Sequence, residues 1–279
     1  MSILLFSILL LLGSFAAGLI GALTGLGGGV VIIPLLVLLF HVNMHFAMGA
    51  SLVSVMATSS GTTAAYLREG YTNLRIGLFL EIAAVIGALV GASLIAFVSK
   101  TFLSFIFIGI LFISAYLTLR RKEEQENYTT SHVWAQRFRL DGTYPDRDKI
   151  KPYKVQNVPA AFLVMCIAGI LSGLLGIGSG ALKVLAMDQT LKLPYKVATT
   201  TSNFMIGITA AVSAGIYFAK GYINALVTFP VLLGVIAGSY CGAKLLTRIP
   251  HQKLRILFSI VICLMGLQML WETTMGNIQ

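Results

Sequence analysis

The chain has 279 residues, of which 57% are hydrophobic and 11% are charged, and its formal net charge is +10. Because a soluble domain carries about 25% charged residues, this composition excludes a globular protein with an ordinary polar surface. Most Lys and Arg residues lie between apolar segments, where they orient a chain in a membrane. They form no basic stripe interleaved with aromatic residues, so no nucleic-acid partner is predicted.

Ten apolar stretches follow one another, and a helix needs about 20 apolar residues to cross a bilayer. They lie at residues 3–23, 28–40, 46–67, 76–98, 102–119, 158–175, 179–191, 197–219, 222–243 and 253–271. We interpret the first as a retained helix, since it lacks the positive leading region of a signal peptide. The two short stretches, 28–40 and 179–191, are either half-membrane helices or tilted partners of broken helices.

A polar, basic stretch from Arg120 to Gln156 separates the first five stretches from the second five. If this loop is cytoplasmic and all ten stretches cross, 17 of the 19 Lys and Arg residues other than Lys183 lie inside and two lie outside. If the two short stretches only enter and return, the distribution becomes 12 to 7. The positive-inside rule therefore favours ten crossings, with both termini outside.

The two sets of five are copies of one unit, because a shift of 151 positions aligns them without a gap over about 75 residues. The aligned pairs include Gly27 and Gly178, Ser51 and Ser202, Thr58 and Thr209, Tyr66 and Tyr217, and Gly87 and Gly238. Five crossings per copy make the second copy inverted, as in secondary transporters. We predict an all-α, polytopic membrane protein, an inverted-repeat bundle of about ten segments (5+5). Its parts are a first repeat (1–119), a basic cytoplasmic loop (120–157) and a second repeat (158–279).

Each copy carries one Gly-rich turn between its first two stretches, TGLGGG at 24–29 and LGIGSG at 175–180. Glycine lets bare backbone approach a ligand, and a helix that starts after such a turn can hold an oxyanion. We hypothesise one anion site between the turns, although tight helix packing also enriches glycine in membrane helices. The candidate residues are Thr24, Gly25, Gly27, Gly28, Gly29, Gly176, Gly178, Ser179 and Gly180.

Lys183 lies three residues after the second turn, inside an apolar stretch. A charge at membrane depth is costly and indicates function by default, so we take Lys183 as an anion ligand; the alternative is a lysine that snorkels to the interface. Asp188 is a candidate counter-ion, and the alternative is that it simply faces the membrane interface. The repeat partner of Lys183 is Ile32, which predicts an asymmetric site.

Hydroxyl and amide side chains open the third stretch of each copy, and they can donate hydrogen bonds to an anion or join helices. The candidates for substrate binding are Ser51, Thr200, Thr201, Ser202 and Asn203. Glu81 is the only carboxylate well inside an early stretch. It is our candidate for a coupling proton, and the alternatives are an ion pair with Arg75 or a hydrogen bond at a helix end.

No catalytic or cofactor motif accompanies these residues: there is no P-loop, HExxH or hydrolase elbow. His41 and His45 have no Cys, Asp or Glu beside them, so a metal site is not expected. The sequence therefore predicts a chain that is not an enzyme, needs no cofactor and is not driven directly by ATP.

Four segments resemble the TauE/SafE family of sulfite and organosulfur anion exporters. They are GLIGALTGLGGGVVIIPLL (18–36), ASLVSV (50–55), GILSGLLGIGSGALKVLAM (169–187) and KVATTTSNFMIG (196–207). By position, the family's Gly-rich motifs fall on the two turns described above. Ser179 replaces a motif glycine, and Leu185 stands where a proline is often found.

The resemblance implies a multi-pass permease of the inner, or plasma, membrane. Its expected substrates are small sulfur-containing anions such as sulfite, sulfoacetate or related sulfonates, exported by alternating access. The alternative is a channel or a carrier for another small solute. The resemblance leaves open which anion moves, in which direction, with which coupling ion and in which oligomeric state.

Overall fold

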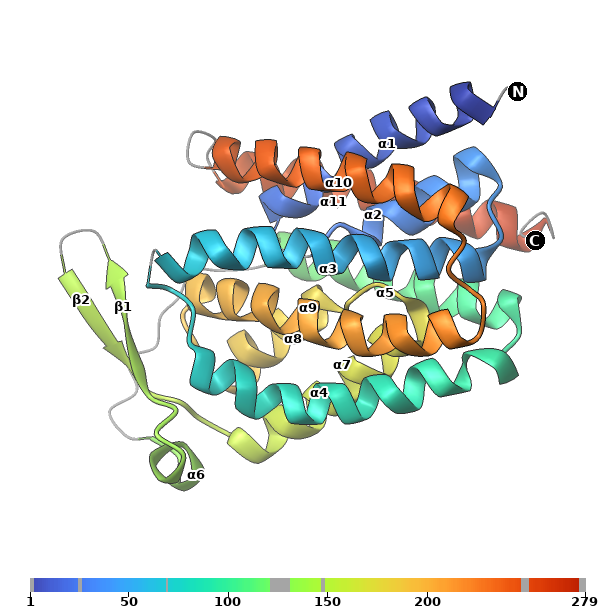
Figure 1. The fold of residues 1–279 in the computed structure, drawn as a ribbon. Helices are drawn as coiled ribbons and strands as arrows, with labels where there is room; N and C mark the ends of the chain where they lie inside the picture. The colour runs from blue at the N-terminus through green and yellow to red at the C-terminus, as the bar shows by residue number, and fades with distance from the viewer. Residues whose placement is uncertain are drawn as a thin grey trace.

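The computed structural model describes residues 3–24, 27–68, 70–120, 131–146, 149–246 and 251–275. Helices account for every apolar stretch that the sequence predicts, which confirms the all-α fold class (Figure 1). The first half contains α1 (Ile3–Thr24), α2 (Gly29–Pro34), the π-helical turn η1 (Leu35–Leu39), α3 (Met44–Arg68), α4 (Leu74–Leu94), the 3₁₀ turn η2 (Ile95–Phe97) and α5 (Lys100–Arg120). The second half contains α7 (Val158–Leu175), α8 (Gly180–Leu185), the π-helical turn η3 (Ala186–Thr190), α9 (Tyr195–Ala219), α10 (Ala225–Leu246) and α11 (His251–Thr274).

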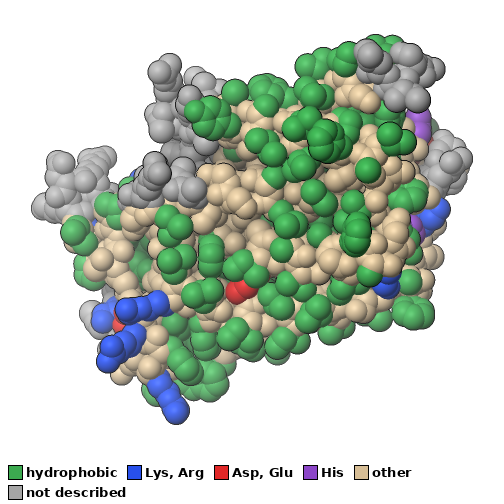
Figure 2. Space-filling model, in the orientation of Figure 1, with side chains coloured by type: hydrophobic (Ala, Val, Ile, Leu, Met, Phe, Trp, Pro, Cys, Tyr) green, Lys and Arg blue, Asp and Glu red, His purple; other side chains and the backbone are tan. Residues whose placement is uncertain are grey.

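The outer surface of the bundle is apolar, as expected of a protein whose solvent is lipid. Within the described residues, five segments are long and apolar enough to cross a membrane: Leu5–Ala22, Leu74–Phe97, Val158–Leu175, Tyr195–Ala219 and Ala225–Gly242. Helix α4 exposes Leu78 and Ile82 by more than half of their surface, and α10 exposes Phe229 in the same way. Figure 2 shows apolar side chains across the middle of this face and Lys and Arg at its two ends. A water-facing surface rarely carries such a band.

The two short stretches are half-length helices. In each of the continuous runs α2–η1 and α8–η3, an α-helix of 6 residues is followed by a π-helical turn of 5 residues. At 1.5 Å per residue each run is about 16 Å long, roughly half of a 30 Å hydrocarbon core. Each run alone is thus shorter than the core, which fits the half-membrane alternative, and the ten crossings that the charge count favours stay a prediction. The chain direction still alternates, and Figure 1 shows both termini at one end of the bundle and β1, β2 and α6 at the other.

The two halves interlock through exchanged helix pairs. Helix α1 packs along α10, and α7 packs along α4, so the first helix of each half lies against the fourth helix of the other. Glycines make these contacts close: a Cβ on Gly18 would lie 2.8 Å from the Val235 Cα, and one on Gly173 would lie 2.8 Å from the Ala92 amide nitrogen. Helix α3 packs on its own counterpart α9, and α5 on α11. Exchanging the halves leaves this pattern unchanged, which confirms the inverted repeat.

The basic loop is more structured than the sequence indicates. It contains the short helix α6 (Val133–Arg137) and a hairpin of β1 (Gly142–Asp146) and β2 (Lys149–Tyr153), in which Gly142 pairs with Tyr153. Asn73, the N-cap of α4, donates to the Tyr153 hydroxyl at 2.7 Å and to the Leu140 carbonyl at 3.2 Å. The loop is thereby attached to the start of α4.

Candidate functional site

The two Gly-rich turns meet in the middle of the bundle. A Cβ on Gly27 would lie 3.2 Å from Ile206 Cγ2 and 3.6 Å from Val55 Cγ1. A Cβ on Gly178 would lie 2.7 Å and 2.9 Å from the same two atoms. Both glycines have left-handed backbone, with φ of 73° and 71°, a conformation that side chains disfavour. The turns of the two halves thus occupy equivalent places against one pair of side chains, from α3 and α9.

A serine from the third helix of each half lies beside the short helix of that half. The Ser202 hydroxyl donates to the Gly180 carbonyl at 3.3 Å. The Ser51 hydroxyl oxygen lies 2.6 Å from where a Cβ on Gly29 would be. The two serines that the gapless alignment pairs therefore occupy equivalent places in the structure, each beside the first residue of a short helix.

Three buried polar groups near the turns have no hydrogen-bond partner among the described residues. They are the Ser51 hydroxyl, the Ser179 hydroxyl and the Asn203 side-chain amide nitrogen. All three residues are 3% exposed or less. Buried polar atoms are normally paired, and hydroxyl and amide groups can each donate to an oxyanion. These side chains are the donors that the site offers.

The backbone amides at the start of α2 are largely occupied. The Val31 and Ile32 amides both donate to the Gly28 carbonyl at 3.0 Å, and the Gly29 amide donates to the Gly27 carbonyl. The backbone of this turn therefore offers fewer free amides to a ligand than a bare helix start would. The side-chain donors provide the better chemistry for an anion.

Other predicted site residues are placed differently. Gly176 packs against α3, where a Cβ would lie 2.8 Å from the Met48 carbonyl oxygen. Thr200 donates to the carbonyl of Lys196 in its own helix at 2.9 Å, and Thr201 accepts from the Asn73 amide at 3.0 Å. Gly28 caps α2 in left-handed geometry. The Thr24 side chain and Gly25 lie outside the described residues.

Lys183 and Glu81 form a buried ion pair. The Lys183 Nζ atom lies 3.2 Å from Glu81 Oε2, and the two side chains are 0% and 4% exposed. The Thr209 hydroxyl donates to Glu81 Oε1 at 2.5 Å and also contacts Lys183 Nζ, which donates to the Met205 carbonyl at 3.2 Å. This cluster joins α4, α8 and α9.

The ion pair corrects two predictions. The counter-ion of Lys183 is Glu81 and not Asp188, which accepts a hydrogen bond from Gln189 at 3.1 Å. The partner of Glu81 is Lys183 and not Arg75, which is exposed. Snorkelling is excluded, because Lys183 is fully buried.

Sequence reasoning did not assign Thr209 to this cluster. Its match with Thr58 in the gapless repeat was the available signal, since apolar composition alone does not align a hydroxyl. The Thr58 hydroxyl donates to the Ser54 carbonyl of its own helix at 2.6 Å.

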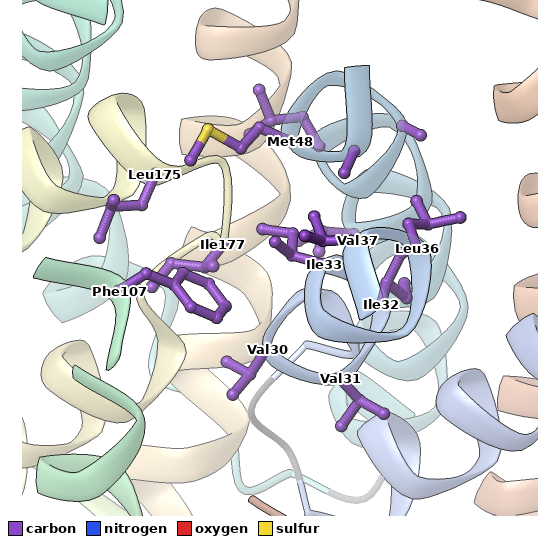
Figure 3. Packing of buried hydrophobic residues seen from close by; sticks show 14 of the residues in the cluster. Val30, Val31, Ile32, Ile33, Leu36, Val37, Met48, Phe107, Leu175 and Ile177 are labelled. Carbon is purple, nitrogen blue, oxygen red and sulfur yellow. The ribbon is translucent and has the colours of Figure 1, made fainter. Parts of the chain in front are cut away.

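The ion pair joins the two halves and has no repeat-related counterpart. The repeat shift places Ile32 opposite Lys183 and Leu232 opposite Glu81. Figure 3 shows Ile32 within the cluster of buried apolar side chains around α2, beside Ile33 and Leu36. The two halves therefore have equivalent backbones around the site, but only one of the two equivalent positions carries a charged pair.

The comparisons with known proteins cover nearly the whole chain. The sequence model of the family described as "Sulfite exporter TauE/SafE" matches residues 10–269. The "Probable membrane transporter protein YunE" of Bacillus subtilis is 31% identical over 96% of this chain and 98% of its own length. The "Probable membrane transporter protein YdhB" of the same organism is 30% identical over 94% of this chain and 100% of its own length.

A similar protein also occurs in Methanocaldococcus jannaschii. Its "Probable membrane transporter protein MJ0441" is 26% identical over 94% of each chain. No solved structure gives a significant match. With its inverted halves, apolar outer face and paired Gly-rich turns, the chain belongs to the TauE/SafE sulfite exporter family of membrane transporters.

Proposed function

We propose that the chain is a secondary transporter that exports small sulfur-containing anions, such as sulfite or sulfonates, across the plasma membrane by alternating access. The observation that carries this proposal is the meeting of Gly27 and Gly178 on Val55 and Ile206. The unpaired donors of Ser51, Ser179 and Asn203 lie on the elements that meet there. An oxyanion would satisfy all three groups, whereas a cation could be met by the two hydroxyl oxygens but not by the Asn203 amide nitrogen, which only donates.

The inverted repeat suits alternating access. Two similar halves in opposite orientation can adopt each other's conformations, which produces inward-open and outward-open forms. The exchanged pairs α1–α10 and α4–α7 are tightly packed through glycine. We propose that they move as units around the turns, with Glu81 as the residue that carries a coupling proton.

A flux assay with purified protein in liposomes tests this function. Sulfite, sulfoacetate, sulfate and chloride are supplied in turn, and saturable uptake of a sulfur-containing anion above protein-free liposomes is expected. Saturable uptake of a cation, or no saturable uptake of any anion, would contradict the proposal.

The matched variants are Asn203→Asp and Ser60→Ala. The first removes a buried donor, keeps the side-chain volume and adds a negative charge, so we expect uptake to fall at least tenfold. The second changes an exposed hydroxyl that bonds its own helix at Met56, and it should transport like the unmodified protein. Size-exclusion profiles in detergent establish that both variants are folded.

A further inference from the structure

The cluster of Glu81, Lys183 and Thr209 is a charge-balanced unit in a region that tolerates little net charge. Both ionic side chains are removed from solvent, and an unpaired charge at membrane depth is strongly unfavourable. Because Glu81 neutralises Lys183 in this conformation, the ammonium is not available to an anion until the carboxylate changes its charge or its partner.

We propose that this pair couples one proton to each monovalent anion: a proton neutralises Glu81 as the anion takes its place on Lys183. The inference rests on the proposed function, and it adds the stoichiometry and the charge of the substrate. With no anion bound, the carboxylate and the ammonium cancel. With a proton on Glu81 and a monovalent anion on Lys183, the cluster is again neutral.

The two mixed states each leave a net charge buried. An anion on Lys183 beside an ionised Glu81 leaves one negative charge, and a protonated Glu81 without an anion leaves one positive charge. The proton comes from water on one side, binds a Glu81 carboxylate oxygen and returns to water on the other side together with the anion, so export runs down the anion's own concentration gradient and carries a proton outward with it. No other bond is made or broken, so the cycle moves no net charge when the anion is monovalent.

Lys183 is placed to meet an anion held at the turns. Ser179 lies four residues before Lys183, and its carbonyl accepts from the Lys183 amide at 3.0 Å. Residues four apart share one face of a helix, and side chains tilt toward the helix N-terminus. The Lys183 ammonium also contacts the carbonyl of Met205, the residue before Ile206, on which both turns rest.

The surroundings of Glu81 leave Lys183 as its charged partner. Helix α4 packs against α7 and α9, and its start is attached to the loop hairpin. Among the side chains that the structure describes, the titratable ones on these elements, on α8 and beside the hairpin are Arg75, Cys166, Lys183, Tyr195, Lys196, Tyr217, Asp141, Tyr144, Tyr153, Lys151 and Lys154, and Arg75 is exposed. The ion pair joins Lys183 to Glu81. The Tyr217 hydroxyl donates to the Gly173 carbonyl at 3.1 Å, and Lys196 is exposed, 5.4 Å from the Tyr71 ring.

The asymmetry of the repeat sets the number of protons. The counterparts of the ionic pair are Ile32 and Leu232, which cannot titrate. Among the described residues, Glu81 is the one fully buried carboxylate. The structure therefore predicts one proton per anion rather than two.

Methanesulfonate is the probe, because it stays monovalent across the working pH range. In liposomes whose membrane potential is clamped to zero with potassium and valinomycin, a gradient of about one pH unit should accumulate it about tenfold on the alkaline side. An imposed potassium diffusion potential should leave this accumulation unchanged. Accumulation that follows the potential and ignores the pH gradient would overturn the inference while leaving anion transport intact.

Glu81→Gln separates coupling from binding. The variant should lose accumulation driven by the pH gradient but still exchange labelled for unlabelled methanesulfonate above protein-free background, since Lys183 no longer has a carboxylate partner. Glu81→Asp, which keeps the charge on a shorter arm, should retain pH-driven accumulation at a lower rate. A Glu81→Gln protein that still accumulates anion with the pH gradient would contradict the inference. Absence of flux for every anion in the unmodified protein would instead contradict the proposed function.

Discussion

Ser51 and Ser202 occupy equivalent positions in the two halves but differ in their hydrogen bonds. Ser202 donates to the Gly180 carbonyl, whereas the Ser51 hydroxyl beside Gly29 has no partner among the described residues. The backbone around the site is thus repeated in the two halves, while the hydrogen bonds of its polar side chains are not. The same holds for the ion pair, which joins Glu81 of the first half to Lys183 of the second and is replaced by Leu232 and Ile32 at the repeat-related positions.

The charged pair should be dispensable for folding and required for transport. Lys183→Ile alone leaves Glu81 buried without a partner and should lower stability by about 3–5 kcal/mol. The double variant Glu81→Leu with Lys183→Ile copies the residues at the repeat-related positions, Leu232 and Ile32. It should recover most of that loss, because replacing a whole buried pair is often neutral. Thermal unfolding in detergent measures both effects.

The same double variant should show no methanesulfonate exchange in liposomes. A double variant less stable than Lys183→Ile alone, or one that transports normally, would contradict the role assigned to the pair.

Gly178 should tolerate a side chain less well than Gly27. Alanine at either position has a left-handed backbone, which costs about 1–2 kcal/mol. At Gly178 the new Cβ would also lie 2.7 Å from Ile206 Cγ2, against 3.2 Å at Gly27. We expect the unfolding temperature to fall for both variants and to fall further for Gly178→Ala.

Gly61→Ala is the matched control for this comparison. Gly61 is a helical residue of α3, and a Cβ added there would meet no atom within 4 Å among the described residues. Alanine at this position should stabilise the protein by about 1 kcal/mol. Equal effects at Gly27 and Gly178 would show that contact between the turns and Ile206 is looser than described.

The attachment of the loop should depend on the Tyr153 hydroxyl. Burial raises the pKa of Tyr153 from 10.0 to about 12, and the hydroxyl accepts from Asn73 at 2.7 Å. Since the pKa of the attached form lies above that of the free form, this contribution is complete below pH 10 and disappears as the pH rises through about 12. Limited proteolysis of residues 131–156 measures the attachment.

Tyr153→Phe should make the loop more susceptible to proteolysis at pH 7 and remove most of the change between pH 10 and 12. Lys151→Ala, which changes another residue of the same strand, serves as the comparison. Unchanged protection in Tyr153→Phe would show that the hydrogen bond does not hold the loop.

The helices were predictable because each one is defined by its own apolar length. The predicted stretch 158–175 coincides with α7, and 3–23 ends one residue before α1 does. The gapless repeat also predicted the pairing of Gly27 with Gly178, since equivalent residues of an inverted repeat meet near its axis. These features depend on local composition and on internal symmetry, both of which the sequence contains.

The features that were missed depend on contacts between distant residues. Glu81 and Lys183 are 102 positions apart, so spacing suggested the nearer Asp188 as counter-ion. The loop hairpin is short and is held by Asn73, which is 80 positions from Tyr153. Neither contact leaves a periodic pattern in the sequence.

The most direct test of the account is the position of a bound oxyanion. Crystals grown with selenite, a selenium analogue of sulfite, can be measured at the selenium absorption edge. We expect an anomalous peak between Gly27 and Gly178, with the anion oxygens within hydrogen-bonding distance of Ser51, Ser179 or Asn203. Selenite bound only away from the two turns, in a protein that transports it, would contradict the claim that the turns form the substrate site.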